Sequence, residues 1–390
     1  MNNSRISELN AFANALGVDG SVKFYEGNAL DVVNVVAPFA RVAVLYEKVS
    51  FEEFGKEFTN KLKVAGVKPL NFIMPKGVTV KLDEVLDVIC VPEDVRAVVC
   101  FDRKIISAAA YIATIFNIPV VYDMRKSVTD GVLPAFVPFS FGGSGAETVS
   151  VSCNYHVALN FGALQEENIA EEYAELIGNL IDLVDYRAKI KVCDGELNKS
   201  VCDEISVAVN EVLEKPTVVN LAFYGLKVQI AHLALNGEII KNSALQSFRC
   251  LTGFNDTEGL TFTLLKKLIP LYNLCAKNQD MPFIVPDYNK RVEELAEITG
   301  SDDGVFLKNL TAQKSALKLA DLRSVKSAVK KELSDIDSAI KKAEKTYLAL
   351  GGKIIEDFSP FLKALKHCGD MTETVNFMSV VRECGFSEFI

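Results

Sequence analysis

The sequence is poor in the residues that usually hold a transition metal. Its 390 residues include only three histidines, and its nine cysteines are widely scattered with no CxxC pair among them. A structural zinc site needs four closely placed cysteine or histidine ligands, so this spacing argues against one. We interpret the cysteines as reduced thiols, most of them small core residues, in a cytoplasmic protein.

The sequence also lacks an excess of positive charge and any long uncharged apolar run. Its net charge of −9 argues against a nucleic-acid binder, because neutralising phosphates requires a basic surface. No run has the length of a membrane span, and the first twelve residues have neither the basic nor the apolar region of a signal peptide. With 49% hydrophobic and 24% charged residues, the chain is typical of a globular protein and long enough for two domains.

Strand and helix patterns alternate through the first 160 residues. The expected elements are strands at 41–46, 70–75, 96–101 and 118–122, and helices at 50–65, 82–91 and 104–116, the last one stopped at Asn117. Strands separated by helices imply parallel crossovers, so the pattern predicts a doubly wound α/β domain over residues 1–160.

After about residue 161 the pattern becomes helical. Apolar residues recur at helical spacing over 169–184, and residues 217–235 are apolar nearly all round, as in a helix at the centre of a helical domain. Residues 321–350 carry dense Lys and Glu, typical of a solvated amphipathic helix or pair. We therefore expect an all-helical domain over 161–390, with a cleft between the two domains as the ligand site.

The turn that links the strand at 96–101 to its helix lacks glycine. Phosphate binding at such a turn needs glycine, because only glycine lets backbone N–H groups close around a pyrophosphate at the helix N-terminus. This turn has Phe101, Asp102, Arg103 and Lys104, with bulky side chains and a carboxylate that repels phosphate. We expect NAD(P) to bind weakly or not at all, although Arg103 and Lys104 can themselves grip an anion.

The order of elements, and the string SVTDGVLP at 127–134, resemble the iron-containing alcohol dehydrogenase and dehydroquinate synthase superfamily. The nearest branch is that of the glycerol-1-phosphate dehydrogenases. The resemblance implies a Rossmann-like parallel sheet followed by an all-α domain, with NAD(P) and one divalent metal as cofactors. Ser127, Asp130 and Gly131 match the bend that faces nicotinamide and substrate in the family.

Other family positions have changed. The family has a glycine triplet where this chain has residues 101–103, and a Pro-Thr pair where it has Asp123 and Met124. Without glycine at this turn the pyrophosphate has no cradle, which makes NAD(P) doubtful here, and the metal is equally doubtful because its histidine ligands are missing.

The resemblance also assigns a metal site, built in the family from one carboxylate and two histidines. The string at 175–187 resembles the carboxylate helix and puts Glu175 at the ligand position, and the best alignment puts Glu258 at another. By periodicity Glu175 lies opposite the apolar stripe of its helix, facing solvent or the cleft. Val228 stands where a histidine ligand would be, and His232 matches a proton-relay position. His232 is either a core residue or a proton shuttle at the cleft.

Three functions follow from this pattern. The first is a diverged, non-catalytic homologue, a pseudoenzyme, acting in binding, regulation or as a partner subunit. The second is an active oxidoreductase that reduces a phosphorylated polyol ketone at an atypical site, and the third is a lyase or cyclase of the same fold. In each case we expect a small-molecule ligand in the cleft, a phosphorylated compound among the candidates, with Asp130 and His232 converging on it. Assembly into a homo-oligomer is left open.

Overall fold

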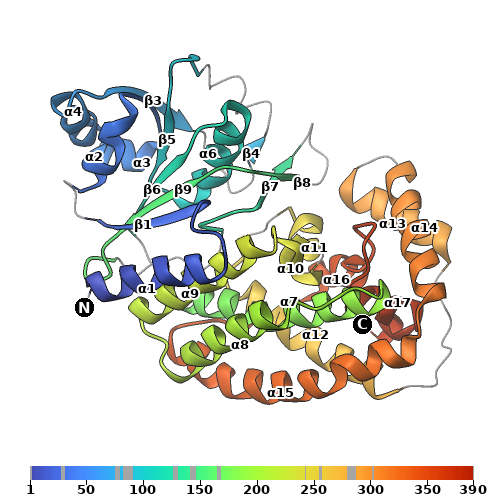
Figure 1. Ribbon diagram of the computed structural model, residues 1–390. Coiled ribbons are helices and arrows are strands. Elements are labelled where there is room, and N and C mark those ends of the chain that lie inside the picture. The colour runs from blue at the N-terminus through green and yellow to red at the C-terminus, as the bar shows by residue number, and fades with distance from the viewer. Residues whose placement is uncertain are drawn as a thin grey trace. The chain divides into compact units, whose positions relative to one another are not determined.

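The computed structural model describes residues 2–27, 31–74, 80–81, 91–125, 131–140, 146–164, 168–241, 243–253, 257–278, 287–300 and 303–389. By its internal contacts the chain divides into two compact units. The α/β unit comprises Met1–Gly142, Glu147–Glu172 and Glu214–Gly237, and the helical unit comprises Gly143–Ala146, Tyr173–Leu213 and Glu238–Ile390. Most strands and helices of each unit are labelled in Figure 1.

A six-stranded sheet forms the centre of the α/β unit (Figure 1). Its strands, in spatial order, are β1 (Val22–Glu26), β9 (Tyr155–Leu159), β6 (Val120–Met124), β5 (Ala97–Cys100), β2 (Arg41–Glu47) and β3 (Lys68–Met74). All five pairings are parallel. The predicted α/β class and parallel sheet are therefore confirmed.

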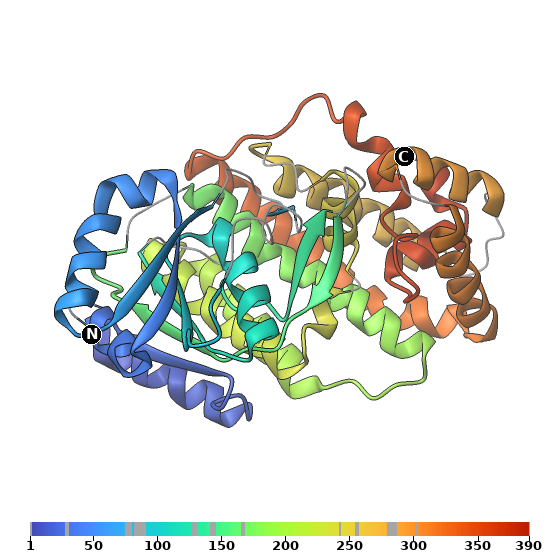
Figure 2. The same ribbon diagram turned by 90° about the horizontal axis from the view of Figure 1, so that it is seen from above.

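Apolar residues alternate along the strands and divide between two cores, one on each face of the sheet. One core joins the strands to α1 (Asn2–Ala15), α6 (Arg103–Phe116) and α9 (Val218–Ala234). The other joins them to α2 (Asp31–Val36) and α4 (Lys56–Val64). Figure 2 shows this sheet from above. Both faces are buried, which explains why β2, β5 and β6 are apolar at nearly every position.

Local signals set the ends of these elements. Asn117 ends α6 in the left-handed conformation, with φ 52° and ψ 49°, as its position after the apolar run predicts. The helix predicted over 50–65 is a continuous helical segment composed of α3 (Lys48–Ser50), a π-helical turn at Phe51–Gly55, and α4. Gly55 allows this segment to pack closely, because a Cβ there would lie 2.6 Å from a ring atom of Phe51. Most of the helix predicted at 82–91 lies outside the described residues.

A smaller sheet contains β4 (Val80–Lys81), β7 (Phe136–Ser140) and β8 (Ala146–Ser150), in the order β4-β7-β8. Helix α9 also belongs to the α/β unit, where Phe223 and Leu226 join the core that contains α1. The division predicted at residue 160 assigns this helix to the helical domain instead.

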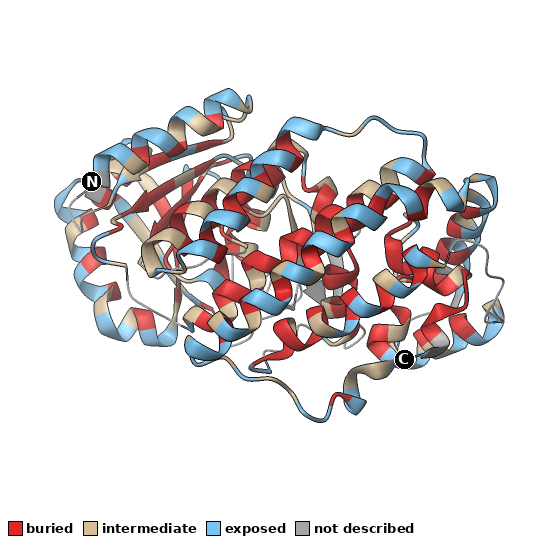
Figure 3. Cartoon of the chain, turned by 90° about the horizontal axis from the view of Figure 1, so that it is seen from below, coloured by how far each residue is buried: buried red, intermediate tan, exposed pale blue. Residues whose placement is uncertain are grey.

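The helical unit is built around α7 and two long packed helices. Its α-helices are α7 (Ile169–Val192), α8 (Lys199–Glu214), α10 (Glu238–Lys241), α11 (Ala244–Leu251), α12 (Leu260–Lys277), α13 (Tyr288–Thr299), α14 (Asp303–Leu319), α15 (Leu322–Ala349), α16 (Leu362–His367) and α17 (Phe377–Glu383). Helices α12 and α15 pack together, and the rings of Phe262 and Tyr347 stack with centroids 4.3 Å apart. Buried and exposed residues alternate along the helices in Figure 3, and α15 buries one stripe from Val325 to Tyr347, as its amphipathic pattern predicts. In the described part of the chain, no helix has the length and apolarity that crossing a membrane requires.

Candidate functional site

The carboxyl ends of β2 and β5 meet at the point where the strand order reverses. From β2 the chain moves outward to β3 on one side, and then returns to β5 on the other side of β2. In open α/β sheets, ligands bind in the crevice outside the strands at such a switch point. Here the crevice would be bounded by Glu47 at the end of β2 and by Asp102, which follows β5.

The carboxylate of Asp102 bridges the ends of these two strands. It accepts hydrogen bonds from the hydroxyl of Ser50 at 2.8 and 2.9 Å, and from the backbone N–H of Glu47 at 3.3 Å. Hydroxyl and backbone N–H donors at the start of a helix are the groups that usually hold a phosphate oxygen. The carboxylate of Asp102 thus occupies both of these donors.

Phe101 fills the adjacent space with an aromatic ring. The ring is stacked on Tyr46, with centroids 5.3 Å apart, and is met edge-on by Phe54 at 5.0 Å and Phe58 at 4.9 Å. Phe101 is 5% exposed and Tyr46 is fully buried, and burial raises the pKa of the Tyr46 phenol to about 12. A glycine at position 101 would leave the volume of this ring unfilled.

Arg125, directly after β6, covers the same aromatic cluster. Its guanidinium lies 3.8 Å from the Phe54 ring centroid and 5.1 Å from that of Phe101, and it forms an ion pair of 2.8 Å with Asp123. Burial raises the pKa of Asp123, although Arg125 opposes this effect. Asp123, which the resemblance aligns with the first residue of the family's Pro-Thr pair, is thus held by an internal ion pair with Arg125.

Arg103 and Lys104, the proposed anion-binding residues, lie in the first turn of α6. Arg103 Nη1 forms an ion pair of 2.9 Å with Glu172, whose side chain is only 8% exposed. This carboxylate neutralises much of the positive charge that Arg103 would offer to a ligand. The role of both residues in binding a cofactor stays a prediction.

Of the residues predicted at the nicotinamide bend, only Gly131 is described. It has φ +69°, a conformation that favours glycine. Ser127 and Asp130 lie outside the described residues, so their proximity to His232 remains a prediction. His232 itself is 2% exposed in the last turn of α9, and its carbonyl accepts the N–H of Gly237 at 2.8 Å. Val228, one turn earlier, is fully buried and offers no ligand atom.

Glu175, the first predicted metal ligand, is held inside the helical unit by other side chains. Its carboxylate forms an ion pair with the guanidinium of Arg249 and accepts a hydrogen bond of 2.8 Å from Thr261 Oγ1. Its side chain is 14% exposed, so it is not a solvated residue. A fixed cation already neutralises this carboxylate, and the pairing does not fit a metal ligand.

Glu258, the second predicted metal ligand, is exposed and pairs with Lys353 at 2.7 Å. Over the described ranges, no group of three or more His, Cys, Asp or Glu side chains is placed to hold a metal ion. The two predicted ligands are thus each matched to a cation of the chain.

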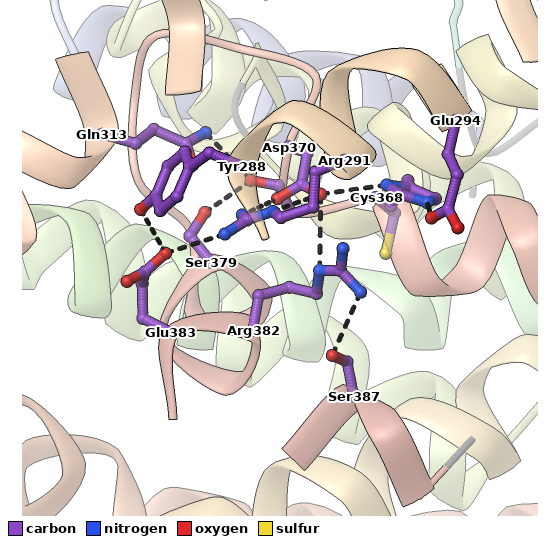
Figure 4. A network of polar contacts seen from close by, with 12 residues as sticks. Tyr288, Arg291, Glu294, Gln313, Cys368, Asp370, Ser379, Arg382, Glu383 and Ser387 are labelled. Atoms are coloured by element: carbon purple, nitrogen blue, oxygen red, sulfur yellow. Dashed lines mark hydrogen bonds and ion pairs between the residues drawn. The ribbon is translucent and has the colours of Figure 1, made fainter. Parts of the chain in front are cut away.

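The most strongly charged buried cluster lies elsewhere in the helical unit, and the sequence did not indicate it (Figure 4). Asp370 is fully buried and contacts Arg291, Arg382 and His367, the last at 3.0 Å. The other ring nitrogen of His367 lies 2.7 Å from Glu294. Burial alone would raise the pKa of Asp370, but the two guanidinium groups and His367 hold it well below its usual range. Asp370 and His367 are close in sequence, but Arg291 and Glu294 lie on α13 and Arg382 on α17, so no local spacing reveals the cluster.

Comparison with solved structures identifies the fold. An archaeal halo-thermophilic alcohol dehydrogenase from a Red Sea brine pool aligns with 95% of this chain and 97% of its own, at a TM-score of 0.57 and 11% identity. A 1,3-propanediol oxidoreductase aligns with 94% of this chain and 97% of its own, at a TM-score of 0.55 and 12% identity. No protein-family model matches the sequence, and no curated protein matches it. The chain therefore has the fold of these two dehydrogenases, in agreement with the α/β and all-helical architecture that the resemblance in its sequence implies.

Proposed function

We propose that this chain is a diverged homologue of the iron-containing alcohol dehydrogenases that binds a small molecule and does not transfer hydride. The observation that carries the proposal is the position of Asp102, whose carboxylate accepts the Ser50 hydroxyl and the Glu47 N–H at the sheet switch point. A dinucleotide pyrophosphate would compete with this carboxylate for donors and would be repelled by its charge.

The residues at the predicted metal-ligand positions support the same proposal. The family reaction uses a divalent metal as a Lewis acid that polarises the substrate oxygen. At the positions assigned to its ligands, Glu175 is paired with Arg249, Glu258 with Lys353, and Val228 has an apolar side chain. Two contacts support the proposal: Asp102 lies in the turn that the resemblance assigns to phosphate binding, and Arg249 pairs with Glu175, which the resemblance assigns to the metal.

The ligand class we propose is a small phosphorylated polyol. Its support is the resemblance of residues 127–134 to the glycerol-1-phosphate dehydrogenase branch, together with the alcohol and diol substrates named for the structural relatives. Gly131, with its positive φ, retains the backbone conformation of a tight bend in this segment.

Calorimetric titration tests the loss of the dinucleotide. We expect the wild-type chain to show no binding of NADH or NADPH at micromolar concentrations. Asp102→Asn keeps the side-chain size but removes the charge, so it should bind inorganic pyrophosphate more tightly than the wild type. Asp94→Asn, which neutralises an exposed aspartate paired with Arg41, is the matched control and should leave binding unchanged. Micromolar NADH binding by the wild type would refute the proposal.

Metal analysis tests the expectation that the chain binds no divalent metal tightly. We expect substoichiometric zinc, nickel and iron after purification without chelators. Stoichiometric metal that is lost in Glu175→Ala would restore the oxidoreductase interpretation, because it would show that Glu175 serves a metal rather than Arg249.

A further inference from the structure

An arginine at the carboxyl end of β6 has its planar head fixed on an aromatic surface. Arg125 directly follows Met124, the last residue of β6. Its guanidinium carbon lies over two rings, 3.8 Å from the centroid of Phe54 and 5.1 Å from that of Phe101. The Phe54 ring meets the buried Phe101 edge-on, so the surface beneath Arg125 is itself packed. A guanidinium stacked on an aromatic face keeps its plane, and therefore its N–H groups, in one orientation.

The ion pair with Asp123 uses one side of this guanidinium. Arg125 Nε donates to Asp123 Oδ2 at 2.8 Å. A guanidinium has five N–H donors, and those of Nη1 and Nη2 have no hydrogen-bond partner in the described part of the chain. The Arg125 side chain is 35% exposed and that of Asp123 only 9%, so solvent reaches the pair mainly through the arginine. The two terminal nitrogens thus remain for a ligand.

Arg103, the other arginine at this end of the sheet, is held differently. Its ion pair with the buried Glu172 is made by Nη1, one of the two terminal nitrogens. A bidentate contact to a carboxylate or phosphate uses two parallel N–H groups of the fork. The fork of Arg103 is therefore partly taken by the chain itself, whereas Asp123 contacts Arg125 at Nε.

The charge around Arg125 is balanced. Asp123 neutralises the guanidinium, and Glu57, whose pKa is lowered mainly by Lys61 and slightly by Arg125, forms an ion pair of 2.6 Å with Lys61. An anion at the terminal nitrogens would therefore be held by directed hydrogen bonds more than by net positive charge. Directed bonds of this kind need the flat fork of an arginine, which a lysine ammonium does not provide.

We propose that Arg125 binds the phosphate group of the ligand, with Nη1 and Nη2 donating to two phosphate oxygens. This inference rests on the proposed function and assigns the anionic end of its small phosphorylated ligand to the carboxyl end of β6. Asp102 occupies the donors beside the turn after β5, and Arg125 supplies other donors from the neighbouring strand. Phosphate binding thereby moves from backbone N–H groups to a preorganised side chain.

Titration of the full chain with inorganic phosphate, followed by phosphorus NMR, tests the site. We expect saturable binding by the wild type, and Arg125→Met should weaken it at least about tenfold, as the loss of charge-assisted hydrogen bonds implies. Arg125→Lys keeps the charge without the fork and should recover only part of the affinity. Arg41→Met is the matched control, because Arg41 begins β2 at the opposite end of the sheet, and it should leave binding unchanged.

A second pair of variants separates binding from folding. Arg125→Met leaves the buried Asp123 without its cation, whereas the double variant with Asp123→Asn has no unpaired charge. The double variant should therefore fold and still bind phosphate at least about tenfold more weakly than the wild type. Asp123→Asn alone should bind phosphate at least as tightly as the wild type, because it removes a negative charge beside the fork. Wild-type affinity in the folded double variant would overturn the proposal.

Glycerol phosphate and malonate distinguish this inference from the proposed function. Tighter binding of glycerol phosphate than of inorganic phosphate, lost in Arg125→Met, supports both. Glycerol phosphate binding that does not need Arg125 overturns the site and leaves the proposed ligand class intact. Arg125-dependent phosphate binding with no preference for glycerol phosphate supports the site and refutes the polyol. Tighter binding of malonate than of either phosphate overturns the assignment to phosphate, since the fork also fits a carboxylate.

Discussion

The carboxyl end of the sheet in the α/β unit and the interior of the helical unit each contain a carboxylate held by other groups, but the groups that hold it differ. At the carboxyl end of the sheet, Asp102 is half-buried and accepts hydrogen bonds from a hydroxyl and a backbone N–H. In the helical interior, Asp370 is fully buried and contacts two guanidinium groups and an imidazole. Strongly perturbed pKa values often mark functional sites. Here the most strongly charged cluster that the structure describes surrounds the fully buried Asp370, whereas the switch point of the sheet contains the half-buried Asp102.

The largest effect should come from breaking the interior cluster. Asp370→Asn removes the carboxylate that Arg291 and Arg382 share, which leaves Arg291 only its ion pair with Glu383 at 2.8 Å. We expect the free energy of unfolding to fall by about 3–5 kcal/mol, as for other broken buried pairs. Urea unfolding followed by circular dichroism measures this change.

The control for Asp370→Asn is the same kind of substitution at Glu373, an exposed acidic residue nearby in the chain. Glu373 pairs with Lys308 at 2.8 Å, but both side chains are more than half exposed. Glu373→Gln should leave the urea midpoint unchanged. Equal midpoints for the Asp370 and Glu373 variants would remove the distinction between the interior and the surface.

Asp185 sharpens the comparison, because it is a buried carboxylate with neutral donors. It accepts hydrogen bonds from the N–H groups of Ala244 and Phe377 and from the Tyr272 hydroxyl, at 2.7–3.0 Å. Burial raises its pKa to about 7, although these donors oppose the shift. The folded state therefore binds this proton more tightly than the unfolded state, so stability decreases as pH rises from about 4 to about 7.

Asp185→Asn should remove this pH dependence. We expect the wild type to lose a few kcal/mol of unfolding free energy between pH 4 and pH 7 relative to the variant, whose amide does not titrate. The variant should also be less stable at pH 4, because one amide N–H would face the Ala244 N–H. Parallel pH profiles for the two proteins would show that Asp185 has an ordinary pKa.

A smaller loss of unfolding free energy is expected at Asp102, at the carboxyl end of the sheet. Asp102→Ala removes hydrogen bonds to Ser50 and Glu47 that are half-buried and involve neutral donors, so the loss should be about 1–2 kcal/mol. A double-mutant cycle with Ser50→Ala should give a coupling energy of about 1 kcal/mol, since the two side chains share one contact. Zero coupling would mean that the Asp102 carboxylate does not hold Ser50, and would weaken its comparison with a bound phosphate.

The fold was predictable from sequence to a greater extent than the site. The alternation of strand and helix patterns along the chain predicted the parallel sheet, and Asn117 predicted the end of α6. The absence of glycine at residues 101–104 predicted a turn without a phosphate cradle, which stays a prediction. Sequence could not show that Asp102 contacts Ser50 or that Arg249 pairs with Glu175, because each pair is more than 50 residues apart. The grouping of α9 with the sheet was also missed, since an all-round apolar helix fits either core.

The smallest effect is expected at Glu258, and it separates the two predicted metal ligands. Glu258 and Lys353 form an exposed pair that water and salt screen, so Glu258→Gln should leave the urea midpoint and the metal content unchanged. Glu175→Gln should lower the midpoint measurably, because Arg249 and Thr261 would lose a partly buried carboxylate. If Glu258 binds a metal with Glu175, both substitutions should instead reduce metal content together and destabilise the metal-loaded protein equally. Metal analysis beside urea unfolding of the two variants distinguishes these outcomes, because ion pairing predicts unequal stabilities at constant metal content.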